Sequence, residues 1–285
     1  MSGWRLPPPP DNPCHLAIEF KTSGETFFFG LGFFKPHLPF SAPKKYWDLY
    51  DRNAITVPPQ TVPSGVNTSL TLSGNGEFIG NYGGTNTIDE AEAKLSIHGY
   101  YACVSFVDAQ IGKVLDELDA LGLSEETVVV LWGDHGWHLG EHTAWGKHTT
   151  LEESLRSTLI VRTPYQARRG VATDCFAESI DLYPTLCELC DVPVPDSVEG
   201  QSFVPALLDP AARPKDFALG LWRKSSTDGY SIRTDRYRLV RWGNNPASPT
   251  QIDLFDYLTD PEGKQNAAAS LPDVVSDLLD RISEL

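Results

Sequence analysis

Residues 127–136 read Thr-Val-Val-Val-Leu-Trp-Gly-Asp-His-Gly, a short apolar run that passes directly into a polar loop. The run has the length of a strand and is rich in β-branched residues, so it predicts a buried β-strand over 127–132. In open α/β sheets, the loops at the carboxyl ends of strands line the ligand crevice. Asp134 and His135, which directly follow the strand, are therefore candidate site residues.

The sequence around this strand predicts an α/β fold. Residues 87–122 predict a long helix, because Thr87–Glu90 has the form of a capping box, apolar residues recur at helical spacing, and Gly122 suits the C-cap. Further predicted elements are buried strands at 26–34 and 158–162 and a helix at 181–189. The order of strand, helix and strand favours a mostly parallel sheet flanked by helices.

The segment from Lys35 to about Gly84 is rich in Pro, Gly, Asn and Ser. A connection of this length is uncommon inside a compact domain unless it has a role of its own. We therefore expect a structured excursion that lies beside a site.

The pattern of apolar and polar residues changes after Pro214. Short alternating runs at 217–222, 230–234 and 237–242 predict antiparallel strands, and the last two flank Asp235-Arg236 as in a hairpin. An amphipathic helix is predicted from Pro272 toward Leu285. The predicted organisation is an α/β domain over residues 1–213 and a small antiparallel-sheet plus helix subdomain over residues 214–285.

Composition excludes two classes of protein. The 285 residues contain 23 Lys and Arg against 38 Asp and Glu, a formal net charge of −15. A nucleic-acid binder needs clustered basic residues to neutralise phosphates, so nucleic acid is not an expected partner. The sequence also lacks a run of about eighteen consecutive apolar residues, so no membrane span is predicted.

Residues 133–148 contain the densest set of chemically active side chains. Four of the seven histidines fall within them, next to Asp134 and Lys147. Asp offers a hard anionic oxygen and His a neutral nitrogen, so Asp134 and His135 could share one divalent cation. The alternative is a loop of ordinary solvated polar residues.

A zinc-protease interpretation competes for the same loop. His138-Leu-Gly-Glu-His142 matches the His-x-x-Glu-His pattern, in which two histidines on one helix hold zinc. That pattern requires a helix, and the glycines at 136 and 140 disfavour one.

A second interpretation adds His37 and Lys147. An imidazole, an ammonium group and a cation together suit a tetrahedral oxyanion, because they stabilise charge on the transferred group and on its leaving oxygen. Sulfate and phosphate esters fit this chemistry. Taken singly, His37 could be a loop-packing residue and Lys147 a solvated lysine.

Four segments, in the same order along the chain, resemble the sulfatases and are closest to the iduronate-2-sulfatase-like branch. They are Phe33-Phe-Lys-Pro-His-Leu-Pro-Phe40, Gly99-Tyr-Tyr-Ala102 with Val107-Asp-Ala-Gln-Ile-Gly112, Trp132-Gly-Asp-His-Gly-Trp-His-Leu-Gly-Glu-His142 with Lys147, and Gly229-Tyr-Ser-Ile-Arg-Thr234. The resemblance implies a fold of the alkaline phosphatase type and hydrolysis of sulfate monoesters on a sulfated small molecule or glycan.

The resemblance also implies roles for individual residues. Asp134 and His135 would be ligands of a calcium ion. His37 would contact the sulfate and help the alcohol to leave, and Lys147 would bind sulfate oxygens. Trp137 and His138 would grip the rest of the substrate.

One family feature has no counterpart in this sequence. The sulfatase nucleophile is a formylglycine made from the Cys of a Cys-x-Pro-x-Arg motif, and none of the five cysteines has Pro two residues on and Arg four residues on. Ser41-Ala-Pro-Lys-Lys45 comes nearest to the serine version but ends in Lys. The resemblance therefore implies a catalytic domain that is incomplete at its N-terminus. Such a chain would hold half of an active site and be inactive alone. It would need an N-terminal half, supplied either by a longer gene product or by a separate polypeptide.

Two other functions stay open at this point. One is a phosphodiesterase or phosphonate hydrolase of the same superfamily, which would use the same oxyanion chemistry. The other is a non-catalytic module that binds a partner through the apolar surface left by the missing strands.

Overall fold

The computed structural model describes residues 26–83, 88–164, 166 and 169–283. These residues form two compact units. The first contains the described residues up to Thr56 together with Glu90–Val129, and the second contains those of Val57–Asp89 together with those from Val130 onward.

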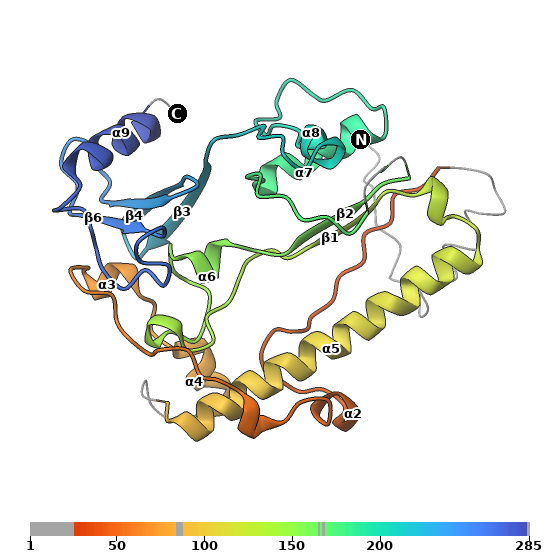
Figure 1. Ribbon diagram of the computed structural model, residues 1–285, viewed down its shortest axis with the longest axis horizontal. Helices are drawn as coiled ribbons and strands as arrows, with labels where there is room; N and C mark the ends of the chain where they lie inside the picture. Colours follow the sequence, from red (N-terminus) through yellow and green to blue (C-terminus); the bar gives the residue numbers. More distant parts are fainter. Residues whose placement is uncertain (1–25, 84–87, 165, 167–168, 284–285) are drawn as a thin grey trace, which may run out of the picture. The chain divides into compact units, whose positions relative to one another are not determined.

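The first unit is built around one long helix. Its elements are α2 (Lys44–Trp47), η1 (Arg52–Ala54), α5 (Glu90–Ala120) and η2 (Ser124–Glu126). α5 confirms the predicted helix, and Gly122 ends it with a positive φ of 70°. The predicted capping residue Thr87 lies outside the described residues. α2 packs along α5 (Figure 1), and Gly99 permits this approach because a Cβ there would lie 3.0 Å from the Trp47 ring.

The second unit contains six strands and several short helices. Its helical elements are α3 (Thr68–Thr71), α4 (Gly76–Tyr82), η3 (Glu141–Thr143), α6 (Glu152–Leu155), η4 (Ser179–Asp181), α7 (Leu182–Leu189), α8 (Val204–Leu208) and α9 (Pro272–Ser283). Its strands are β1 (Val129–Trp132), β2 (Leu159–Arg162), β3 (Ala218–Lys224), β4 (Thr227–Arg233), β5 (Tyr237–Trp242) and β6 (Gln251–Asp256). No helix within the described ranges is both long enough and apolar enough to cross a membrane.

β1 and β2 confirm two predicted strands, but their pairing differs from the predicted parallel arrangement. The amide of Gly133, just after β1, donates to the carbonyl of Thr158, just before β2, at 2.8 Å. The end of β1 therefore meets the start of β2, and the two strands run antiparallel. The cause is the connection between them, which returns through a loop and α6 to the same end of β1 and makes no crossover.

Residues 26–34 do not form the predicted strand. The segment carries no ladder hydrogen bonds among the described residues, and Phe28 and Phe34 are 85% and 66% exposed. An apolar run becomes a strand only when a neighbouring strand supplies hydrogen-bond partners, and no described segment pairs with this one.

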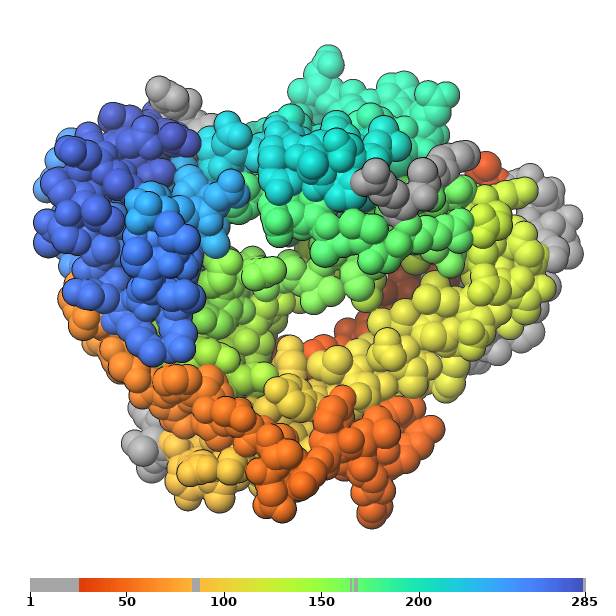
Figure 2. Space-filling model, viewed as in Figure 1, coloured from red at the N-terminus to blue at the C-terminus, as the bar shows by residue number. Residues whose placement is uncertain are grey.

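The C-terminal sheet confirms the predicted antiparallel strands. It has the order β3-β4-β5-β6, and the Thr234 amide donates to the Tyr237 carbonyl at 2.8 Å, which closes the predicted two-residue turn Asp235-Arg236. α9 covers one face of this sheet (Figure 1), and the blue residues of the sheet and helix form one continuous block in Figure 2. The domain boundary at residue 214 stays a prediction.

An apolar core and a hydrogen-bonded buried carboxyl group stabilise the C-terminal sheet. On the α9 side, the apolar core consists of Ile232, Leu239, Leu254 and Leu278, each at most 2% exposed. The fully buried Asp253 accepts hydrogen bonds from the Thr71 hydroxyl of α3 at 2.7 Å and from the Trp242 indole at 3.1 Å. A buried carboxyl group needs such donors, because without them its desolvation would destabilise the fold.

Candidate active site

The polar loop that follows β1 is held by backbone hydrogen bonds. After the Gly133–Thr158 bond, the Gly136 amide donates to the Ser154 carbonyl at 2.8 Å, and the His138 amide donates to the Gly146 carbonyl at 2.7 Å. The loop is thereby tied to α6 and to the segment that carries Lys147. Its geometry does not depend on side-chain contacts alone.

Asp134 and His135 lie side by side at the start of this loop. The Nδ1 atom of His135 is 2.7 Å from the Gly136 carbonyl, which can only accept, so the neutral ring keeps its lone pair on Nε2. That Nε2 atom is 3.6 Å from Oδ2 of Asp134. The Asp134 side chain is 74% exposed, and both atoms could reach one cation from this position.

Asp134 and His135 are suitable ligands for a divalent cation by residue type, but two ligands are too few to complete a calcium site. Calcium contacts its ligands at about 2.4 Å, so two ligand atoms of one ion can be up to about 5 Å apart. The separation within the Asp134–His135 pair satisfies this limit. Calcium takes about six to eight ligands, however, and no group of three or more His, Cys, Asp or Glu side chains suited to a metal occurs among the described residues. The described residues alone do not complete a calcium site.

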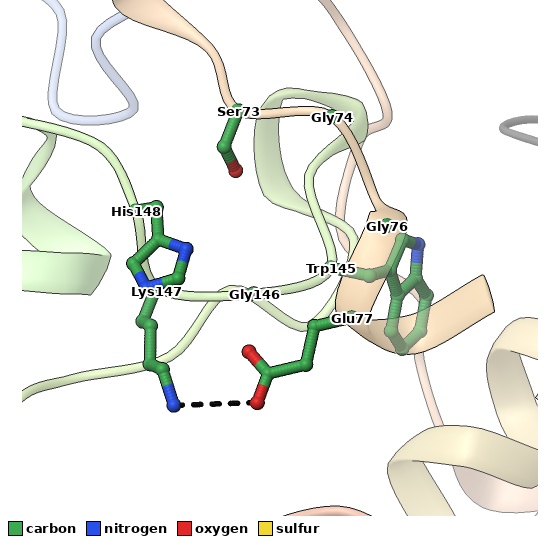
Figure 3. A pocket seen from close by; sticks show the side chains of 8 residues that line it. All are labelled: Ser73, Gly74, Gly76, Glu77, Trp145, Gly146, Lys147 and His148. Atoms are coloured by element: carbon green, nitrogen blue, oxygen red, sulfur yellow. Dashed lines mark hydrogen bonds and ion pairs between the residues drawn. The ribbon is translucent and has the colours of Figure 1, made fainter. Parts of the chain in front are cut away.

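Lys147 lies at the edge of a cavity with its ammonium group between two partners. Its Nζ atom is 3.4 Å from Oε1 of Glu77 and 5.6 Å from the centre of the Trp137 ring (the ion pair is shown in Figure 3). The ring face attracts a cation, so Trp137 and Glu77 together fix where the lysine charge lies. The structure thus brings together two of the predicted site residues, Lys147 and Trp137.

The cavity beside Lys147 has a volume of about 470 Å³. Its lining comes from two segments far apart in sequence: Ser73, Gly74, Gly76, Glu77, Trp145, Gly146, Lys147 and His148. The ring of His148 stacks on Trp222, with 4.8 Å between ring centres and planes only 8° apart. Burial, and then the neighbouring Lys147 charge, lower the pKa of His148, so its ring is neutral at pH 7.

His138 lies in the interior. Its side chain is fully buried, and its Nε2 atom is 2.9 Å from the Thr149 hydroxyl. This burial is typical of a histidine that packs the loop, and the substrate contact of His138 stays a prediction.

The zinc-protease interpretation is wrong in its geometry. Residues 138–142 do not form an α-helix, because Gly140 and His142 both have positive φ angles, of 112° and 58°. Glu141 accepts a hydrogen bond from the Leu139 amide at 2.6 Å, within the same turn. His142 instead faces Glu153, with 3.4 Å between Nε2 and Oε1.

His37 belongs to the first unit. Its Nδ1 atom is 2.9 Å from the Leu38 carbonyl, so the neutral ring presents an unprotonated Nε2. Its ring lies 5.0 Å from the ring of Phe34. The catalytic role of His37 stays a prediction.

Comparison with known proteins shows where this arrangement belongs. The family model described as "Sulfatase" matches residues 14–192, more than half of the chain. This chain belongs to the sulfatase family. A second model, described as "N-sulphoglucosamine sulphohydrolase, C-terminal", matches residues 140–285.

Individual relatives agree with the family. Iduronate 2-sulfatase of Mus musculus is 28% identical over 303 residues, which cover 81% of this chain and 54% of the relative. A structure solved with its substrate D-glucosamine-2-N,6-O-disulfate has a TM-score of 0.72 at 19% identity, covering 88% of this chain and 63% of that one. The phosphonate monoester hydrolase of Silicibacter pomeroyi has a TM-score of 0.75 at 22% identity, covering 96% and 59%. The α/β fold is therefore that of the sulfatases and the alkaline phosphatase superfamily. The chain spans about half the length of the curated relatives it matches.

Sequence reasoning missed two residues at or beside the cavity. Glu77 contacts Lys147 from 70 positions away. Asn75, 4% exposed, accepts from the Trp145 amide at 2.9 Å and donates to the Thr143 carbonyl at 3.2 Å. The only sequence signal was the long polar excursion ending near Gly84, which was predicted to lie beside a site. Its residues Ser73, Gly74, Gly76 and Glu77 line the cavity.

Acidification is expected to destabilise this chain through His138. Burial lowers the pKa of His138 to about 4 from the usual 6.5, so the folded state binds fewer protons than the unfolded state between these pH values. Stability is then fully present above pH 6.5 and falls by up to about 3 kcal/mol as the pH drops toward 4. Urea unfolding at several pH values measures this slope. His138→Gln should flatten the slope and Thr149→Val, which keeps the imidazole, should retain it; an unchanged slope in His138→Gln would contradict the assignment.

Gly136→Ala is expected to destabilise the loop that carries Asp134 and His135. A Cβ at Gly136 would lie 2.0 Å from the carbonyl oxygen of Glu153 and 2.8 Å from that of Arg156, and backbone atoms cannot easily yield. The overpacking should cost about 1–3 kcal/mol, measured by thermal unfolding. Gly146→Ala is the control, since a Cβ there meets nothing within 4 Å. Equal melting temperatures for the two variants would show that the loop is looser than described.

Proposed function

We propose that this chain carries the sulfate- and cation-binding half of a sulfatase active site, which hydrolyses sulfate monoesters when the attacking group comes from sequence beyond these 285 residues. The observation that carries the proposal is the Lys147 ammonium, held beside a cavity by Glu77 and Trp137. A fixed cation next to an open cavity suits a tetrahedral anion. The loop with Asp134 and His135 supports the same chemistry.

Each residue has a defined task in this proposal. Lys147 binds sulfate oxygens and stabilises the charge that builds up on them as the sulfur–oxygen bond breaks. His37 gives a proton to the leaving alcohol oxygen, for which its ring must first be protonated. Asp134 and the Nε2 lone pair of His135 would hold calcium, which when bound supplies positive charge to the reacting groups.

The sequence lacks the motif that provides the attacking group in the sulfatase family. No cysteine in it has Pro two residues on and Arg four residues on, so the precursor of a formylglycine is not recognisable. We infer that an N-terminal part, in a longer gene product or in a separate polypeptide, provides this group together with the remaining cation ligands. The isolated chain would then bind calcium weakly and turn over little or no substrate.

The substrate class follows from the relatives and from the composition. The relationship to iduronate 2-sulfatase supports a sulfated sugar, at an identity of 28% that leaves the particular sugar open. The net charge of −15 argues against strong electrostatic capture of polyanionic glycans. A small sulfated sugar with few further negative charges fits both observations.

The test compares the 285-residue chain with the longer protein that includes the N-terminal part, each with added calcium. Turnover of 4-nitrophenyl sulfate is expected for the longer protein and not for the chain alone. Appreciable turnover by the chain would contradict the inference about the attacking group. If the longer protein hydrolyses a phenylphosphonate monoester faster than the sulfate ester, the phosphonate hydrolase alternative is favoured over a sulfatase. If it hydrolyses neither ester, a partner-binding module is favoured.

A further inference from the structure

The cavity beside Lys147 has two fixed charges of opposite sign in its lining. Of its eight lining residues, only Lys147 and Glu77 have charged side chains at neutral pH, because His148 is neutral there. The two groups face each other across 3.4 Å, with the Ser73 side chain pointing into the space between their segments (Figure 3). The side chains of Lys147 and Glu77 are only 16% and 31% exposed, so solvent screens this pair incompletely.

This pairing affects which anions the cavity can accept. When a sulfate group binds Lys147, its negative charge comes close to the Glu77 carboxylate. Like charges at such a distance repel each other unless a positive charge compensates. A simple sulfate ester on Lys147 therefore brings an unfavourable contact with the Glu77 carboxylate, whereas an ester that also carries an ammonium group offsets this contact by pairing with Glu77.

The spacing restricts where that ammonium group must lie. The carboxylate and the lysine are 3.4 Å apart, so a sulfate on Lys147 and an ammonium on Glu77 must also be close to each other. Four charges that alternate in sign around such a square attract along every side. Amino and sulfate groups on adjacent ring carbons of one sugar meet this requirement.

We propose that Glu77 makes the cavity selective for sulfated amino sugars whose ammonium group lies next to the sulfate, so that the ammonium pairs with Glu77 while the sulfate pairs with Lys147. This proposal rests on the proposed sulfate-binding role of Lys147. Glu77 acts as a specificity-determining residue, because the same carboxylate repels esters that carry a second negative charge near the sulfate.

The test measures binding to the 285-residue chain at pH 7 by NMR titration, with glucosamine 3-sulfate and glucose 3-sulfate as probes. The two probes differ by an ammonium group in place of a hydroxyl. We expect glucosamine 3-sulfate to bind about tenfold more tightly, the size of a charge-assisted hydrogen bond in a partly exposed site. Glu77→Gln should remove this difference, chiefly by weakening glucosamine 3-sulfate binding.

Two controls separate this proposal from the one on which it depends. Glu188→Gln changes an exposed glutamate of α7 that does not line the cavity, and should keep the preference. Lys147→Ala should weaken both probes. Equal affinity for the two probes, with both lost in Lys147→Ala, would overturn the role of Glu77 and leave the sulfate site standing. Binding of neither probe, or binding unaffected by Lys147→Ala, would overturn both proposals.

Discussion

Lys147→Ala in the longer protein is expected to lower kcat/KM for 4-nitrophenyl sulfate by about 10²- to 10³-fold, the usual effect of removing one fixed donor to a developing negative charge. The ammonium group lies beside the cavity at a position set by Glu77 and Trp137, and neither neighbour can replace its positive charge. Steady-state kinetics at saturating calcium measure the loss.

A matched variant shows whether this loss is specific. Lys264→Ala removes a lysine that pairs with Glu262 and has a 47% exposed side chain outside the cavity. It should leave kcat/KM within about twofold of wild type, because exposed ion pairs contribute little. A loss of less than tenfold in Lys147→Ala would mean that other groups hold the sulfate.

Asp134→Ala in the longer protein is expected to weaken calcium binding by about 100-fold. Calcium affinity follows the number and charge of its oxygen ligands, and this change removes an anionic ligand that the structure presents to solvent beside His135. Isothermal titration with calcium measures the effect independently of turnover. Asp196→Ala, which removes another exposed carboxylate, should bind calcium as wild type does. Unchanged affinity in Asp134→Ala would place the cation elsewhere.

The C-terminal subdomain was the most predictable part of the fold. Local pattern alone placed the hairpin around Asp235-Arg236 and the helix α9, because both bury their own alternating or amphipathic faces. β6 escaped prediction because Asp253 interrupts its apolar residues and Asp256 ends it. Asp253 is buried and accepts hydrogen bonds from Thr71 and Trp242, and such distant partners cannot be recognised in a local sequence pattern.

The apolar run at 26–34 shows the opposite case. Its composition has the form of a buried strand, yet strand formation depends on a neighbour to pair with, and composition says nothing about that neighbour. Because no described segment pairs with this run, Phe28 remains exposed.

Some residues of the candidate site could be predicted from the sequence and others could not. The position of Asp134 and His135 directly after a strand, and the lysine shortly downstream, were readable from sequence because they lie on one continuous loop. Glu77 was not, because its contact with Lys147 depends on how the preceding excursion folds back. Sequence also could not separate the buried His138 from its partly exposed neighbour His135, since burial is decided by packing against Thr149 and Glu153.

The most direct test is a crystal structure of the longer protein with calcium and sulfate bound. We predict sulfate oxygens within about 3 Å of Lys147 Nζ and of a ring nitrogen of His37, and a cation on Asp134 and His135 in the same cavity. A sulfate bound away from Lys147, or these four side chains facing different cavities, would contradict the account.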